Sequence, residues 1–108
     1  MIKIMLIIMC ACLISVTLFV SATKYNHIQE MKCIGERAKL FIQPGSKICD
    51  EQITLLGDDI KYIDIVDCFS ERDSCDDIDI SLTPAWEINK QRIYKLLNVT
   101  KLKEKTNC

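Results

Sequence analysis

The N-terminal segment, residues 1–22, constrains the fold most, because it has the pattern of a targeting segment rather than of part of a folded domain. Lys3 is followed by an uncharged run from Ile4 to Val20, and Val20 and Ala22 are small residues at the positions that a signal peptidase reads. The pattern predicts a secretory signal peptide over residues 1–22, cleaved after Ala22. An uncleaved anchor is the alternative, although an apolar run from Ile4 to Val20 is at the short limit for crossing a bilayer.

The chain from Thr23 to Cys108 can form one small domain, and this length excludes large enzyme folds. Domains of this size are rarely stabilised by a hydrophobic core alone, and the oxidising compartments that a signal peptide leads to permit disulfides. Five of the seven cysteines lie in this part: Cys33, Cys49, Cys68, Cys75 and Cys108. An odd number leaves at least one thiol free or paired with another chain.

Charge is distributed unevenly along this domain. Residues 58–79 are strongly acidic, whereas residues 98–108 form a basic C-terminal tail that contains Lys101, Lys103 and Lys105. We predict that these three lysines bind glycosaminoglycans, with a solvated tail as the alternative. Secretion argues against a nucleic-acid partner. Asn98 begins the sequence Asn-Val-Thr and is the predicted N-glycosylation site.

The sequence predicts neither an enzyme nor a metal or cofactor site. It contains no Cys-x-x-Cys motif, and its sole histidine, His27, lies in a polar segment, residues 23–32, that we expect to be a flexible arm. A Ser or Cys nucleophile would lack an adjacent base there. The acidic residues 76–79 lack the spacing of a calcium loop, so a solvated loop is expected.

The pattern of residues 33–97 predicts an α+β fold. We expect an irregular segment at 33–46, strands at 48–56 and 60–69 joined as a hairpin, a third strand at 75–82, and a helix of roughly 14 residues that begins at Thr83-Pro84. Trp86, Ile93 and Leu97 recur at helical spacing and would pack that helix on a three-stranded antiparallel sheet.

The expected hairpin also suggests how the cysteines pair. If Asp58-Asp59 is the turn, Cys49 lies opposite Cys68, at a separation close to that of a disulfide. Cys33 and Cys75 would then pair, and Cys108 would be left unpaired. The other two pairings of these four cysteines stay open, and the combination of Cys33–Cys49 with Cys68–Cys75 would indicate another fold.

The expected order of elements from Glu30 to Leu97 resembles a chemokine. The segment Glu30-Met31-Lys32-Cys33 is similar to the Glu-Leu-Arg-Cys opening of one CXC subgroup, and Pro84 and Trp86 resemble the start of the family's helix. Two family cysteines are missing, one of them at Gly35 or, in the alternative alignment, at Met31. The resemblance then implies a single family-type bond, similar to that of C-type chemokines. The Cys49–Cys68 bond would be foreign to the family.

This resemblance implies a secreted ligand of a chemokine G-protein-coupled receptor, either agonist or decoy. By the same resemblance, the residues that contact the receptor would be Glu30, Met31, Lys32 and Ile34. The many isoleucines, and the excess of lysine over arginine, suggest an AT-biased genome and a virus-encoded mimic. The alternative is a secreted, disulfide-stabilised immune-evasion or envelope-complex protein without chemotactic activity, linked to its partner through Cys108.

Overall fold

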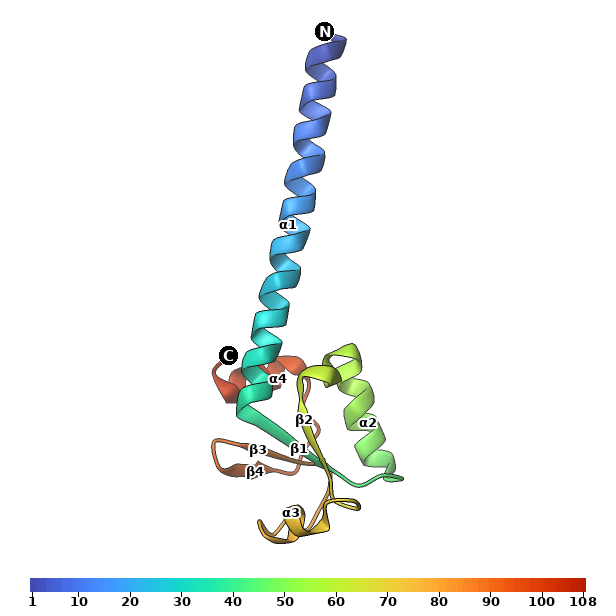
Figure 1. Ribbon diagram of the computed structural model, residues 1–108, viewed down its shortest axis with the longest axis vertical. Helices are drawn as coiled ribbons and strands as arrows, with labels where there is room; N and C mark the ends of the chain where they lie inside the picture. The colour runs from blue at the N-terminus through green and yellow to red at the C-terminus, as the bar shows by residue number, and fades with distance from the viewer.

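The computed structural model describes all 108 residues and consists of a small α+β domain at the end of one long helix (Figure 1). Helix α1 spans Ile2–Arg37, and the molecule is 72 Å long because the N-terminal part of α1 projects away from the domain. No proline or glycine, the two strongest helix breakers, precedes Gly35, so nothing in the sequence interrupts this helix.

The domain is built on a mixed sheet of four short strands in the order β2-β1-β3-β4. Strand β2 runs parallel to β1, whereas β3 is antiparallel to both β1 and β4. The bounds of the strands are Ala38–Ile42 for β1, Asp64–Asp67 for β2, Ala85–Ile88 for β3 and Gln91–Ile93 for β4. Parallel neighbours need a crossover, and helices α2 (Lys47–Leu56) and η1 (Gly57–Tyr62) supply it.

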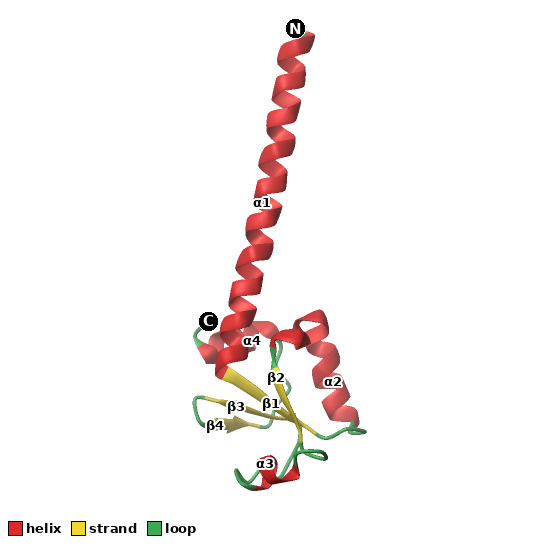
Figure 2. Ribbon diagram, in the orientation of Figure 1, coloured by secondary structure: helices red, strands yellow, loops and turns green.

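Helices cover both faces of the sheet (Figure 2). Successive side chains of β1 point to opposite faces, so β1 contributes to the hydrophobic core on each of them. Leu40 joins the larger core, together with Met31 and Ile34 of α1 and Leu102 of α4 (Val99–Thr106). Phe41 points to the opposite face and joins a smaller core that includes Cys75 of α3 (Arg72–Asp76). The expected α+β class with disulfides is confirmed, but the expected antiparallel three-stranded sheet is wrong.

Residues 48–56 form a helix rather than the expected strand. Ser46 caps α2, and Cys49, Gln52 and Leu56 are its buried residues, which recur at the spacing of one helical face. The expected hairpin turn at 58–59 is part of η1, so the strand expected at 60–69 shortens to β2 and pairs in parallel with β1.

The helix expected after Thr83-Pro84 is instead a β-hairpin. The Thr83–Pro84 peptide is cis, and β3 begins at the next residue. Asn89 and Lys90 both have positive φ angles, which suit a two-residue turn between twisted strands. Trp86 pairs with Ile93 across the hairpin, so the spacing that suggested a helical face marks a cross-strand pair.

Four other segments also differ from the prediction. Residues 23–32 are not a flexible arm but continue α1, and the basic C-terminal tail predicted at 98–108 contains α4. The segment 33–46 contains β1, and the strand expected at 75–82 is replaced by the end of α3 and a loop.

The disulfides join Cys33 to Cys108 and Cys68 to Cys75, with Cα atoms 5.9 and 5.7 Å apart. The predicted pairs Cys33–Cys75 and Cys49–Cys68 are therefore wrong, as is the prediction that Cys108 is unpaired. The physical reason is the helical state of 47–56, which removes the hairpin that would have set Cys49 opposite Cys68. Cys49 is instead a free, buried thiol.

Candidate functional site

The turn between β1 and α2 places a serine and a cysteine at the start of a helix. Gly45 has a φ of 84°, which turns the chain into α2, and the Oγ atom of Ser46 accepts a hydrogen bond from the Cys49 backbone N–H at 3.5 Å. The Cys49 side chain is only 1% exposed, and its sulfur accepts a long hydrogen bond from the Gln43 backbone N–H, also at 3.5 Å. Solvent-borne reactants therefore cannot reach this thiol.

A largely apolar groove of about 250 Å³ lies beside this turn. One wall is Ile48 of α2, and the rest comes from the segments on either side of the β3–β4 hairpin. The lining residues are Ile48, Leu82, Thr83, Pro84, Tyr94, Lys95 and Leu96. The four large apolar side chains among them are between 41% and 65% exposed, which makes this the main exposed apolar patch of the folded domain.

A buried glutamine holds the walls of the groove together. The Gln52 Oε1 atom accepts hydrogen bonds from Trp86 Nε1 at 3.0 Å and from the Leu97 backbone N–H at 2.8 Å. Its Nε2 donates to the Leu97 carbonyl oxygen at 2.8 Å. Gln52 lies one turn after Ile48, and Leu97 directly follows the groove residues 94–96. The network therefore fixes the α2 wall relative to the strand segments.

The rim of the groove has main-chain groups that make no internal hydrogen bond. Twelve backbone–backbone hydrogen bonds form outside the helices and strands, and none falls on residues 81–84 or 94–96. Strand β4 is also an edge of the sheet. Free amides and carbonyls beside apolar side chains are what an extended peptide needs to bind along a sheet edge. Lys95 is the only charged residue of the lining.

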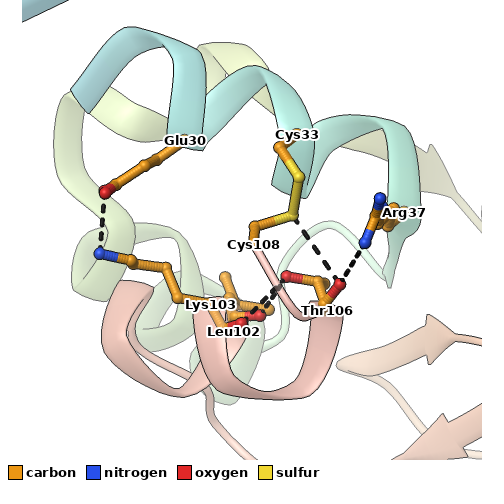
Figure 3. The surroundings of a disulfide bond; sticks show 7 residues. All are labelled: Glu30, Cys33, Arg37, Leu102, Lys103, Thr106 and Cys108. Atoms are coloured by element: carbon orange, nitrogen blue, oxygen red, sulfur yellow. Dashed lines mark hydrogen bonds and ion pairs between the residues drawn. A yellow bond between two sulfur atoms is a disulfide. The ribbon is translucent and has the colours of Figure 1, made fainter. Parts of the chain in front are cut away.

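A second cluster of polar contacts ties α1 to the C-terminal segment (Figure 3). The Cys33–Cys108 disulfide is flanked by an ion pair of 2.9 Å between Glu30 and Lys103 and by a 2.8 Å hydrogen bond from Arg37 to the Thr106 carbonyl oxygen. Thr106 is itself buried and donates its hydroxyl to the Leu102 carbonyl oxygen at 2.6 Å. We call these contacts the α1–α4 clamp.

The residues predicted to contact a receptor lie on α1, inside or next to this clamp. Met31 and Ile34 are fully buried in the larger core, and Glu30 is engaged by Lys103. Lys32 is the one exposed member of the predicted set. The structure therefore does not present these four residues together on one surface.

The predicted glycan-binding lysines lie on α4, and two of them have acidic partners. Lys101 pairs with Glu104 at 3.4 Å and Lys103 with Glu30, which leaves Lys105 without an ion pair. Asn98 is exposed and caps α4 through its Oδ1 atom, 2.9 Å from the Lys101 backbone nitrogen. N-glycosylation at Asn98 and glycan binding by the lysines stay predictions.

The Cys68–Cys75 loop is held by the carboxylate of Asp67. Partial desolvation opposes ionisation of this group, but hydrogen bonds from the backbone N–H groups of Phe69 and Ser70 and from the Ser70 hydroxyl outweigh it and lower the pKa of Asp67. Phe69 is 72% exposed on this loop and lies outside the groove.

Comparison with known families does not add to this picture: no family model matches the chain, and no curated protein matches it either. The site therefore has to be interpreted from its own geometry. Sequence reasoning missed Ser46, Gln52, Pro84 and Tyr94 as a group. One signal was present, because a serine followed by an apolar helical face with an acidic first turn indicates a capped helix at 47–56.

Proposed function

We propose that this chain is an extracytoplasmic binding protein whose groove beside Pro84 holds an extended peptide segment of a partner protein. The observation that carries the proposal is the combination of an exposed apolar lining with unpaired main-chain groups on both rims. Main-chain hydrogen bonds would supply affinity and the apolar side chains specificity. Lys95 favours a partner segment that carries a carboxylate next to its apolar residues.

The location outside the cytoplasm is supported by two features of the chain. Its N-terminal helix is apolar and near the N-terminus, as in exported proteins, and its folded domain contains two disulfides. Disulfides persist in oxidising compartments and are rare in the cytosol. Export would place the groove where it meets secreted or surface-exposed partners.

The proposal assigns binding rather than thiol–disulfide chemistry to the site. A Cys-x-x-Cys pair associated with a β–α–β unit is the motif of thioredoxin-like redox proteins, and β1, α2 and β2 form such a unit here. By this fold-level analogy the motif positions are Ser46 and Cys49. Exchange needs an accessible thiolate as the attacking group, and Cys49 is buried. A serine cannot replace the missing cysteine in this reaction.

A pair of matched variants tests the proposal. Short synthetic peptides with an apolar centre, each made in one version with an aspartate and one with a lysine, would be screened for binding to the purified protein. We expect the aspartate versions to bind. Tyr94→Ser should lower their affinity at least about tenfold, because an aromatic side chain at the centre of an interface contributes a large share of the binding energy. Phe69→Ser removes an exposed aromatic side chain outside the groove and should have no effect. Equal weakening by both substitutions would refute the groove as the binding site.

Signalling through a chemokine receptor, which the sequence predicts, remains a separate prediction. It is tested by calcium-flux and receptor-displacement assays with protein that begins at Thr23. The helical state of residues 23–37 means that any receptor contact would involve a helix rather than a flexible arm.

A further inference from the structure

We infer that the N-terminal part of α1 stays in the chain as a membrane anchor, with bilayer hydrocarbon covering residues 4–23. The inference rests on the proposed location outside the cytoplasm. The first observation is that this part of α1 is apolar on all sides. It contains a window that is long and apolar enough to cross a membrane, and the domain buries none of that window. A helix that is apolar all round is stable in a protein core or in a membrane, and the domain does not supply a core for it.

The length of the segment matches the thickness of a bilayer. Lys3 and Lys24 bracket the uncharged segment 4–23. It consists of the apolar run that ends at Val20, followed by Ser21, Ala22 and Thr23. At the rise of an α-helix, a segment of about 20 residues spans about 30 Å, the thickness of a typical hydrocarbon core. The two lysines can extend their ammonium groups to the headgroups on either side.

Helix α1 is continuous across the predicted cleavage site, as the inference of an anchor requires. The helix does not end near Ala22 but runs to Arg37. Its C-terminal third belongs to the domain through buried Met31 and Ile34 and through the α1–α4 clamp. Proteases prefer exposed, poorly ordered segments, whereas the Ala22–Thr23 peptide lies in helical backbone.

A further contact stiffens the helix close to the membrane. His27, three residues after Lys24, lies 2.9 Å from the Asp59 carboxylate of η1. The domain is therefore attached to α1 within about one helical turn of the charge that marks the membrane surface. Because the disulfides require the domain to lie outside, residue 1 would be on the cytoplasmic side.

This arrangement leaves the peptide groove free. Figure 1 shows that α2 begins at the side of the domain away from the projecting part of α1 and runs back toward it. Ile48, in the first turn of α2, is a wall of the groove. An anchored domain would thus present the groove away from the membrane.

The free cysteines provide a test with the unmodified chain. Cys10 and Cys12 lie in the apolar segment and Cys49 in the domain, and none of the three is in a disulfide. The full chain would be expressed in a secretion-competent host, fractionated, and alkylated in denaturant without reductant. We expect protein that resists alkaline carbonate extraction and carries three alkylated thiols. In intact membranes Cys10 and Cys12 should not react with a water-soluble maleimide.

The other outcomes separate the anchor from the proposed function. Protein in the medium with one alkylated thiol, Cys49, would overturn the anchor and leave peptide binding intact. Cytosolic protein with all seven thiols reduced would overturn the anchor and the location on which peptide binding rests. Leu13→Lys should lower the carbonate-resistant fraction at least about tenfold, whereas the matched Leu13→Val should not change it. Equal retention of both variants would also overturn the anchor.

Discussion

Cys33 and Cys108 are 75 residues apart in the sequence and are joined by a disulfide that fixes the C-terminus of the chain to α1. Cys33 lies on the part of α1 that also supplies Met31 and Ile34 to the core. The bond therefore connects three parts of the molecule, namely the long helix, α4 and the larger core. The Glu30–Lys103 ion pair and the hydrogen bond from Arg37 to the Thr106 carbonyl oxygen act at the same junction.

Removal of this bond should lower the stability of the domain and release α4. We expect Cys108→Ser to reduce the free energy of unfolding by about 2–5 kcal/mol, because the disulfide closes a long loop in the unfolded chain. Urea unfolding followed by circular dichroism measures the effect. Cys12→Ser, which removes a free cysteine outside the domain, is the control and should leave stability unchanged. Equal stability of the two variants would contradict the clamp.

The Gln52 network should be the most sensitive polar site of the domain. Gln52→Leu keeps a side chain of similar size but leaves Trp86 Nε1 and the Leu97 backbone N–H without partners. Each unpaired buried group costs about 1–3 kcal/mol, so a loss of at least about 2 kcal/mol is expected in urea unfolding. Gln43→Leu, at an exposed position, serves as the matched control. If Gln52→Leu lowers the free energy of unfolding no more than the control does, Gln52 does not hold the walls of the groove.

The lowered pKa of Asp67 predicts an acid-sensitive loop. A carboxylate whose pKa is lower in the folded than in the unfolded chain stabilises the fold above its ordinary pKa of 3.8, and this contribution disappears as the pH falls through the folded value. The free energy of unfolding should therefore decline below about pH 4 more steeply in the wild type than in Asp67→Asn. Urea unfolding at constant ionic strength measures both slopes. Identical slopes in the wild type and in Asp67→Asn would refute the assignment.

A single substitution should give the protein thiol–disulfide exchange activity. Ser46→Cys places a thiol three residues before Cys49 at the start of α2, where the helix dipole favours a thiolate. We expect this variant to form a new intramolecular disulfide in glutathione redox buffer and to accelerate disulfide exchange. The wild type and Lys47→Cys should not. Exchange by the wild type would contradict the assignment of a binding role to the site.

Sequence reasoning predicted the class of the fold and the apolar N-terminal segment but not the topology. Of the apolar residues it selected, Cys49, Trp86 and Leu97 are buried, whereas Ile93 is only partly buried and Leu82 and Leu96 are exposed. Because the segments are short, the spacing of their apolar residues did not distinguish the period of a helix from that of a strand. Trp86 and Ile93 fit both a helical face and a cross-strand pair. The strand predicted at 48–56 did not take into account that Ser46 can cap a helix.

The candidate site was not predictable in the same way. Its residues come from α2, from the segment before β3 and from the segment after β4. The pairing of β1 with both β2 and β3, and of β3 with β4, sets these elements in place. The prediction of the disulfide pairs was wrong for a related reason. Their prediction depended on one hairpin. The Cys33–Cys108 bond depends on the helical state of residues 23–37, which had been predicted as a flexible arm and the start of an irregular segment.

The most direct test of the account is a map of the residues that a bound peptide contacts. Isotope-labelled domain would be titrated with the aspartate-containing peptide of highest affinity, and backbone amide shifts and hydrogen-exchange protection would be recorded. Peptide binding in the groove predicts changes at Ile48, Leu82, Thr83 and residues 94–96, with new amide protection on at least one rim of the groove. Changes centred on the loop around Phe69 or on η1, with the groove unaffected, would contradict it.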